Sequence, residues 1–180
     1  DLASFGKGLS NGFPLSAIVG RRDILDEMPR IFFSGTFGGE TLSLAAAKVV
    51  LDRYKTGEPT RVMAEKGQDL RDRIERAMPD AARSFLSFSG HPTWVFHQWA
   101  IEDQQILAEA KTLLLQEGLR RGLLALGTHE VTTAHTDEDL ELAATALTEA
   151  VNVVAEGMAD GDLRSRLECE PILPLFRVRS

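Results

Sequence analysis

The chain has 180 residues, of which 43% are hydrophobic and 26% charged, a composition typical of a soluble protein with one ordinary domain or two small ones. A formal net charge of −7, with the basic residues scattered along the chain, argues against binding to nucleic acid. No apolar run is long enough to predict a membrane span and no secretory leader is recognisable, while a single Cys169 is typical of a reducing compartment, so we expect a cytoplasmic protein.

Two short apolar segments flank a first glycine-rich turn. Residues 1–7 and 15–19 predict buried strands, and residues 8–14 between them are rich in Gly, Ser, Asn and Pro, which turns require. Lys7 is therefore expected at the end of a buried strand with a glycine on each side. Partial loss of hydration there would favour the neutral amine, which is the form that attacks a carbonyl carbon. A solvated lysine in a surface turn explains the same residues.

Helices are predicted on both sides of a second glycine-rich turn. Asp23 begins a brief helix that should end before Pro29. The turn at residues 34–39 carries hydroxyl groups, and Thr41 is the predicted N-cap of the helix after it. The buried face of that helix is expected at Leu42, Ala45, Ala46, Val49 and Val50.

After a break at residues 56–59, the pattern changes to that of a small α+β domain built on long helices. A helix from Thr60 should end at Met78, and residues 85–88 and 93–99 predict a hairpin around a turn at 89–92. The buried face of the helix is expected at Met63, Gly67, Leu70, Ile74 and Ala77.

The last part of the chain predicts two further helices. One spans residues 103–121 and ends at Gly122, and residues 123–126 and 130–133 after it are strand-like. Thr136 with Asp139 resembles a capping box that begins the second helix, which should end near Gly157. Its buried stripe is expected at Leu140, Ala144, Leu147, Val151 and Val154. A charged connector at 160–168 and an extended tail at 171–178 complete the prediction.

Neither glycine cluster matches a nucleotide-binding motif. A P-loop requires G-x-x-x-x-G-K-[ST], whereas Lys7 is followed by Gly8, and Gly6, Gly8 and Gly12 are spaced one residue too widely for G-x-G-x-x-G. The four histidines lack a metal-ligand spacing on one element, so they are interpreted as structural or surface residues. No G-x-S-x-G nucleophile elbow is present.

Lys7 and the turn Ser34-Gly35-Thr36 together fit another requirement. A lysine amine condenses with an aldehyde, and the backbone N–H groups of a glycine-rich helix start, with a hydroxyl group, can bind a phosphate. Pyridoxal 5′-phosphate carries both an aldehyde and a phosphate. From these residues alone, two ordinary connecting turns remain an alternative.

Three ordered motifs resemble the class III pyridoxal-phosphate-dependent aminotransferases. FGKGLSNGFPLSA at residues 5–17, continued by GRRD at 20–23, resembles the active-site segment of the family, and SGTF at 34–37 resembles its later G-T-[FL] segment. AHTDED at 134–139 is similar to the C-terminal signature of the glutamate-1-semialdehyde aminomutase-like branch. The chain departs from the family at residues 39–41, where Gly-Glu-Thr replaces the common G-N-P, which concerns the substrate rather than the cofactor.

The resemblance implies the α/β fold of a fold-type-I transferase. Residues 1–57 would be the C-terminal part of the large cofactor domain, and residues 58–180 the small C-terminal domain. Lys7 would form the internal aldimine with pyridoxal 5′-phosphate and move the proton during amino-group transfer. Thr36, with Gly35 beside it, would bind the cofactor phosphate of the partner subunit in a homodimer. The substrates would be an amino donor and a keto or aldehyde compound, with no nucleic-acid or membrane partner.

The resemblance also places three groups upstream of the lysine: the Asp that pairs with the pyridine nitrogen, the aromatic that stacks on the ring and the main phosphate loop. We therefore expect this chain to be the C-terminal portion of a longer enzyme and inactive alone. An aminomutase or racemase that uses the same lysine and a catalytically incomplete fragment stay open as alternatives. Arg21, Arg22, Arg177 and Arg179 could bind a substrate carboxylate, although solvated surface positions are expected for all four.

Overall fold

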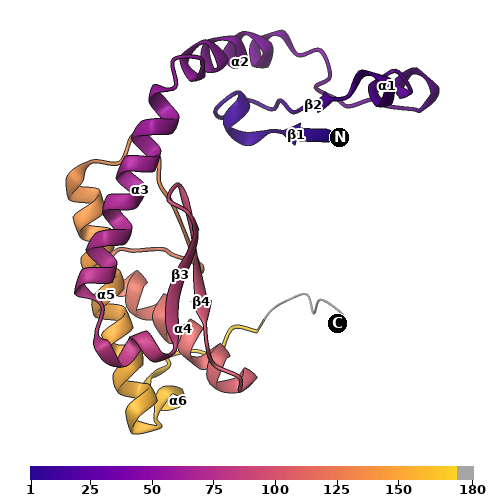
Figure 1. Ribbon diagram of the computed structural model, residues 1–180. Coiled ribbons are helices and arrows are strands. Elements are labelled where there is room, and N and C mark those ends of the chain that lie inside the picture. The colour runs from indigo at the N-terminus through magenta and orange to yellow at the C-terminus, as the bar shows by residue number, and fades with distance from the viewer. Residues whose placement is uncertain (174–180) are drawn as a thin grey trace. The chain divides into compact units, whose positions relative to one another are not determined.

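The computed structural model describes residues 1–173, and the chain divides into two compact units, Asp1–Thr60 and Arg61–Ser180 (Figure 1). Predictions that concern residues 174–180, including most of the extended tail, Arg177 and Arg179, lie outside the described residues. None of the helices in the described part combines the length and the apolar character that crossing a lipid bilayer requires.

The first unit begins with a two-stranded antiparallel ribbon. Strands β1 (Leu2–Phe5) and β2 (Ala17–Gly20) pair with Leu2 opposite Gly20 and Phe5 opposite Ala17. The prediction that these strands are buried is wrong, because every residue of β1 and all but Ala17 of β2 are exposed. A pair of strands that no further strand joins has no second layer from which to build a core.

Short helical segments and one long helix complete the first unit. The short ones are η1 (Lys7–Leu9), α1 (Arg22–Leu25) and η2 (Met28–Arg30), and the long one is α2 (Thr41–Tyr54). Helix α1 ends before Pro29, as predicted. The N-cap of α2 is Glu40 rather than Thr41, because the Glu40 carboxylate accepts hydrogen bonds from the backbone of Leu42 and Ser43.

The buried face of α2 differs from the predicted one. Leu42 and Val49 are 60% and 71% exposed, whereas the buried or half-buried positions share a stripe rotated by about one residue. That stripe consists of Ser43, Ala46, Ala47 and Val50. Small residues lie there because α2 packs against the turn η1.

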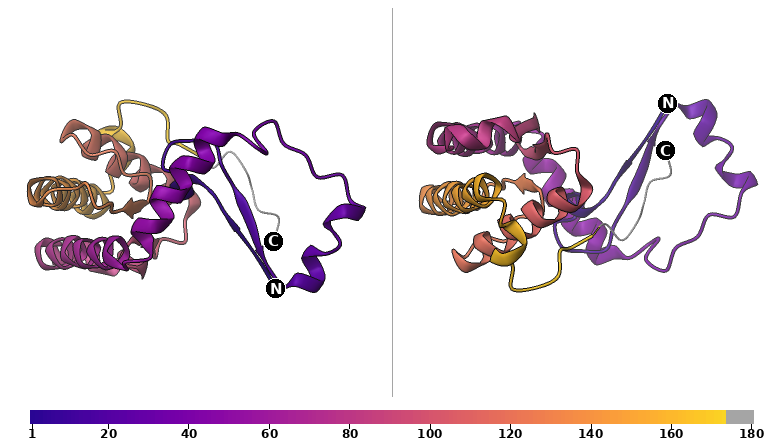
Figure 2. Two further views of the ribbon diagram at one scale, coloured as in Figure 1. Left: turned by 90° about the horizontal axis from the view of Figure 1, so that it is seen from above. Right: turned by 90° about the horizontal axis from the view of Figure 1, so that it is seen from below.

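The second unit has a three-stranded antiparallel sheet and a layer of long helices. The sheet order is β3 (Leu86–His91), β4 (Trp94–Trp99), β5 (Thr128–Glu130), and η3 (Asp80–Ser84) precedes β3. Helices α3 (Glu58–Ala77), α4 (Gln104–Arg120) and α5 (Asp137–Asp160) lie on one face of this sheet, and α6 (Leu163–Arg166) follows α5 (Figure 2).

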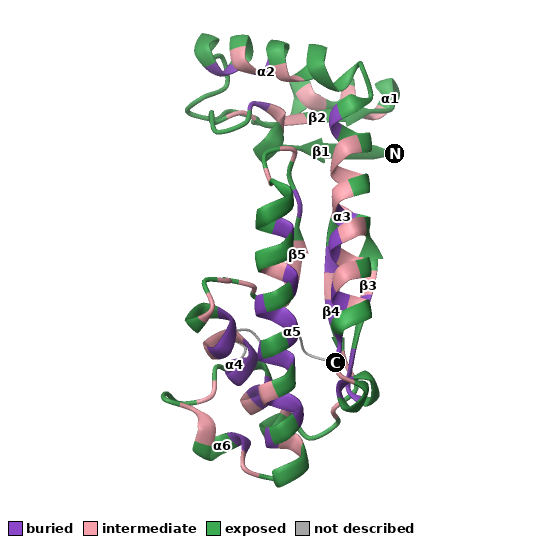
Figure 3. Ribbon diagram, turned by 90° about the vertical axis from the view of Figure 1, so that its left-hand side faces the viewer, coloured by how far each residue is buried: buried purple, intermediate pink, exposed green. Residues whose placement is uncertain are grey.

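Burial in the second unit follows the predicted helical stripes closely. In α3, Gly67, Leu70 and Ile74 are buried as expected, while Ala77 is exposed. All five predicted stripe residues of α5 are buried, and the side of α5 that they occupy is visible in Figure 3. The capping box of Thr136 and Asp139 is confirmed, and α5 ends at Gly161, which adopts a left-handed conformation with φ 69°.

The strand predictions in this unit are partly wrong. The hairpin is confirmed, but its strands extend to a tight turn, in which His91 pairs with Trp94. Residues 123–126 form no strand, because the chain turns at Gly122 and Gly127, both with positive φ, and pairs with β4 only from Thr128. The predicted charged connector contains helix α6.

Gly67 brings α3 close to the hairpin turn. A Cβ atom built at Gly67 would lie 1.9 Å from the carbonyl oxygen of Pro92, far inside contact distance. Only glycine allows this approach, so the helix and the turn are packed backbone to backbone at this point.

Candidate active site

Lys7 adopts a backbone conformation that is rare for its residue type. Its φ is 48°, in the left-handed region that Gly and Asn usually occupy. Gly6 before it is extended, and the N–H of Leu9 donates to the carbonyl oxygen of Gly6 at 3.0 Å. Holding a lysine in this region costs on the order of 1 kcal/mol, and such strain persists only where surrounding structure imposes it.

The turn around Lys7 is held in place by polar contacts and by α2. Ser10 is buried and its hydroxyl donates to the carbonyl oxygen of Phe13, while Asn11 is left-handed with φ 47°. The packing of α2 on η1 places the small buried residues Ser43 and Ala47 on the inner face of the helix. The residues after Lys7 therefore form a defined turn.

The Lys7 side chain itself is exposed, and it has no hydrogen bond or ion pair within residues 1–173. The expectation that burial of β1 would desolvate this amine is wrong for the same reason that β1 is exposed. The ammonium group is nevertheless free to bind a ligand, because no carboxylate in the described part of the chain pairs with it.

Thr36 and Gly35 lie in an exposed turn before α2. The N–H of Gly38 donates to the carbonyl oxygen of Gly35 at 3.0 Å and closes this turn, and the Thr36 hydroxyl has no partner among the described residues. No hydrogen bond joins Thr36 to Lys7. None is required by an assignment that places this threonine on the cofactor of the partner subunit.

The helix start behind Thr36 is already occupied by a side chain. The Glu40 carboxylate accepts from the backbone N–H of Leu42 at 2.8 Å and of Ser43 at 2.7 Å, and also from the Ser43 hydroxyl. The Ser43 hydroxyl, followed by these two amides, holds the pKa of Glu40 below its usual value. The amides of Leu42 and Ser43 are therefore not free to bind a phosphate, whereas the hydroxyl of Thr36 in the turn before them has no partner among the described residues.

These residues fit pyridoxal 5′-phosphate as far as one chain supplies its site. The amine of Lys7 and the hydroxyl of Thr36 have no partner within residues 1–173, and a Cβ atom built at Gly8 or Gly35 would meet nothing within 4 Å. The backbone beside both groups is therefore open to a bulky ligand.

The two arginines of the GRRD segment lie on the surface, as expected. Arg21 pairs with Asp1 at 3.2 Å and with Asp23 at 2.5 Å, and all three side chains are more than half exposed. The Arg21 guanidinium lowers the pKa of Asp23. Arg21 thus already has two carboxylate partners within its own chain.

A comparison with protein families decides the relationship. The profile of the family described as aminotransferase class-III matches residues 1–148. The chain belongs to the class III aminotransferases. This match includes the segments around Lys7 and Thr36 and the capping box of α5, and it confirms the family suggested by the three motifs.

Relatives of this class III chain carry several different names. A 3-aminobutyryl-CoA aminotransferase of Cloacimonas acidaminovorans is 23% identical over 154 residues, which cover 84% of this chain and 37% of the relative. An acetylornithine aminotransferase of Halalkalibacterium halodurans is 33% identical over 78 residues, covering 43% and 20%. A glutamate-1-semialdehyde 2,1-aminomutase of Methanocaldococcus jannaschii is 34% identical over 82 residues, covering 41% and 19%. The chain thus spans well under half of the length of these relatives.

Solved structures confirm the fold. The FumI protein of Sphingopyxis sp. MTA144, in a PLP internal aldimine form, superposes with a TM-score of 0.73 at 23% identity and covers 88% of this chain and 38% of its own. The ornithine aminotransferase of Toxoplasma gondii superposes with a TM-score of 0.72, also at 23% identity, and covers the same shares. The chain therefore has the predicted α/β fold, that of part of a fold-type-I transferase, and its family is dependent on pyridoxal phosphate.

The structure brings together two histidines that were not predicted to meet. His97 on β4 and His129 on β5 have their Nε2 atoms 3.0 Å apart, and the ring of Phe88 lies edge-on to His97 at 5.5 Å between centroids. Burial lowers the pKa of His97 to about 3 and of His129 to about 4, and repulsion from His129 and Lys111 contributes at His97. The alternation along β4, which turns Val95, His97 and Trp99 to one face, was the available signal.

Within the described residues, no group of three or more potential ligands among His, Cys, Asp and Glu could hold a metal ion.

Proposed function

We propose that the protein containing this chain catalyses pyridoxal-phosphate-dependent amino-group transfer, with Lys7 as the residue that binds the cofactor covalently. The observation that carries the proposal is the strained, glycine-flanked Lys7, whose amine is free, within the segment that resembles the family's active site. Residues 1–57 would then belong to the large cofactor domain and residues 58–180 to the small domain.

Bound pyridoxal phosphate supplies an aldehyde that condenses with amines and a ring that withdraws electrons from the substrate Cα. Lys7 has two roles beside it. Its Nζ would hold the cofactor covalently through the aldehyde. As a free amine beside the bound cofactor, the same Nζ would act as the base that accepts the proton of the substrate Cα, and as the acid that donates it back to the substrate or the cofactor. The turn from Lys7 to Leu9 holds the backbone from which this side chain extends.

Thr36 would donate a hydrogen bond from its hydroxyl to the cofactor phosphate of the partner subunit in a homodimer. Its free hydroxyl and the open backbone at Gly35 support this role. Because Glu40 occupies the amides of Leu42 and Ser43, we assign this contribution to the Thr36 hydroxyl rather than to those two amides.

The proposed substrates are an amino donor and a keto or aldehyde acceptor, and the proposed setting is the cytoplasm. The names of the relatives include an aminobutyryl thioester, acetylornithine and glutamate semialdehyde. The compounds in these names have different carbon chains, and the reaction that the names have in common is the movement of an amino group.

The test is Lys7→Ala in the whole protein that carries this chain. We expect loss of turnover by roughly 10³-fold or more, since both the nucleophile and the base are removed, and loss of the visible absorbance of covalently bound cofactor. Lys48→Ala, an exposed lysine on α2 paired with Asp52, is the matched control and should keep both. Normal transamination and absorbance in Lys7→Ala would overturn the proposal.

Thr36→Ala in the same protein should weaken cofactor affinity by about tenfold, because one hydrogen bond to a charged phosphate is lost. Thr36→Ser keeps the hydroxyl and should retain most of the affinity, which equilibrium dialysis of the cofactor can measure. Equal affinities of the wild type and Thr36→Ala would remove Thr36 from the phosphate site while leaving the role of Lys7 intact.

An aminomutase is the second candidate. It is favoured by the relatives with that name, one of which is 34% identical over 82 residues, and by the AHTDED segment. An aminomutase moves the amino group within one substrate, so product formed without any added acceptor would favour it over a transaminase.

A catalytically incomplete chain is the remaining alternative for these 180 residues taken alone. Because they span 37% or less of the relatives named above, we expect them to show no transamination by themselves. Titration of the isolated chain with pyridoxal phosphate measures whether it binds the cofactor, and an assay with an amino donor and a keto acceptor measures turnover. Turnover by the isolated chain would contradict the expectation.

A further inference from the structure

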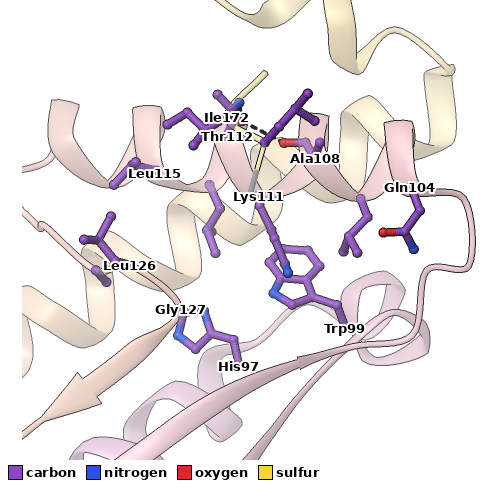
Figure 4. Close-up of a pocket in the computed structure, with 14 residues that line it drawn as sticks. His97, Trp99, Gln104, Ala108, Lys111, Thr112, Leu115, Leu126, Gly127 and Ile172 are labelled. Carbon is purple, nitrogen blue, oxygen red and sulfur yellow. Dashed lines mark hydrogen bonds between the residues drawn. The ribbon is translucent and has the colours of Figure 1, made fainter. Parts of the chain in front are cut away.

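A cavity of about 390 Å³ lies within the second unit, between α4 and the side of β4 that faces the helices (Figure 4). Its walls include Trp99 from β4, Leu107 and Leu115 from α4, and Ala125 from the segment that precedes β5. Both its volume and its largely apolar lining are those of sites that bind small organic molecules.

One polar atom at this cavity has no partner. His97 lines the cavity, its residue is only 8% exposed, and its Nδ1 is buried without a hydrogen bond to any described residue. Its Nε2 is engaged with His129. An unpaired ring nitrogen in such a place costs free energy, and a ligand that bonds to it would remove that cost.

Lys111 supplies a positive charge on the wall of the cavity that α4 forms. Lys111 extends from α4 toward Trp99 (Figure 4) and is close enough to His97 for its charge to lower the pKa of that histidine. Lys111 forms no ion pair or hydrogen bond within residues 1–173. The cavity therefore combines a free ammonium, an unsatisfied imidazole nitrogen and an aromatic wall.

We propose that this cavity binds a small monocarboxylate with an apolar, aromatic body. The carboxylate pairs with the Lys111 ammonium and accepts a hydrogen bond from His97 Nδ1, in the tautomer in which His129 Nε2 donates to His97 Nε2. The body of the ligand packs against Trp99 and the leucines of α4. Lys111 disfavours a cationic ligand, and no group of three or more metal-ligating side chains occurs in the described part of the chain.

The first measurement is a titration of the chain with 3-phenylpropionate, followed by tryptophan fluorescence. Trp94→Phe simplifies the signal, because Trp94 is 51% exposed and does not line the cavity, so that Trp99 alone reports. We expect saturable binding, and binding of the neutral amide 3-phenylpropanamide that is at least about fivefold weaker, since the amide lacks the charge that pairs with Lys111. Absence of saturable binding, or equal affinities for acid and amide, overturns the proposal.

Two variants locate the site. Lys111→Gln should weaken binding of the acid by about fivefold and leave binding of the amide unchanged, whereas Lys48→Gln, a lysine of the first unit, should change neither. Ala125→Phe fills the cavity and should abolish binding of both compounds, with circular dichroism to verify that the variant is folded. Unchanged binding of the acid in Lys111→Gln, or in folded Ala125→Phe, places the ligand elsewhere and overturns the proposal.

Discussion

The two units of the chain differ in how they bury apolar side chains. In the second unit, one cluster of buried residues joins α3, the sheet, α4, α5 and α6. In the first unit, the buried residues are only Ser10, Ser43, Ala47 and Pro59. Many large apolar side chains there are instead exposed, among them Leu2, Phe5, Ile18, Val19, Ile31, Phe32, Phe33, Phe37 and Leu44.

The buried core and the residues of the proposed active site therefore belong to different units of the chain. The second unit has one contiguous cluster of buried apolar residues, whereas the first unit leaves many of its large apolar side chains exposed. The proposed catalytic Lys7 and the proposed phosphate ligand Thr36 both belong to the unit with few buried residues. Local opening should therefore be easier around them than in the second unit.

The largest contrast is expected for matched leucines in the two units. Leu147 of α5 is 1% exposed, and Leu147→Ala should lower the free energy of unfolding by about 3 kcal/mol, because it leaves a cavity in the core. Leu44 of α2 is 49% exposed, and Leu44→Ala should change it by less than about 0.5 kcal/mol. Urea denaturation of both variants measures the contrast, and equal losses would show that the units do not differ in this way.

The histidine pair gives the second unit a pH dependence that the first unit lacks. His97 and His129 are neutral in the folded chain, with pKa values of about 3 and about 4, and the pKa of each is 6.5 without burial. Below pH 6.5 the unfolded chain therefore binds more protons than the folded chain. The stability that depends on the two neutral histidines is fully present above that pH, and it is lost as the pH falls through the folded pKa values of about 4 and about 3. The slope approaches about 1.4 kcal/mol per pH unit for each histidine.

Denaturation between about pH 6.5 and about pH 5 isolates this effect, because the carboxylates with lowered pKa titrate below that window. His129→Asn should reduce the slope to roughly half, since one of the two histidines is removed. An identical slope in the wild type and His129→Asn would refute the assignment.

The smallest contrast concerns the two helix caps. Thr136→Ala removes the hydroxyl that accepts from the N–H of Asp139, and it should cost the second unit about 1 kcal/mol of unfolding free energy. Glu40→Ala removes the N-cap of α2, a helix with only two buried residues. Hydrogen exchange should therefore accelerate at Leu42 and Ser43 without a shift of the main unfolding transition. A shift of that transition in Glu40→Ala would show that α2 unfolds together with the core.

Local signals in the sequence were sufficient for the three long helices of the second unit, α3, α4 and α5, but not for the short helix α6. The pair Thr136 and Asp139 and the apolar stripe from Leu140 to Val154 predict α5 because caps and helical periodicity depend only on neighbouring residues. The same reasoning misplaced the buried face of α2. Helical periodicity predicted Ala46 and Val50, which are half-buried, but also Leu42, Ala45 and Val49, which are exposed. The contact with η1 instead buries Ser43 and Ala47.

Features that depend on distant parts of the chain could not be predicted in this way. The meeting of His97 with His129 requires the register that places Val95 opposite His129, and no local pattern specifies that pairing. The apolar residues 123–126 suggested a strand, but strand formation there would have required a partner that β4 provides only from Thr128. The sequence motif indicated Lys7 as a candidate active-site residue, but its left-handed backbone conformation became known only from the structure.

Because the φ of Lys7 is positive, backbone stability and the need for an amine favour different residues at position 7. Glycine at position 7 would relieve the backbone strain, and a more stable first unit would be the expected gain, yet the same replacement would remove the amine. Screens that select variants only for thermal tolerance or expression should therefore drift toward Gly or Asn at this position and lose the amine on which the proposed function depends. Any engineering of this chain for robustness should hold position 7 fixed and seek its gains elsewhere.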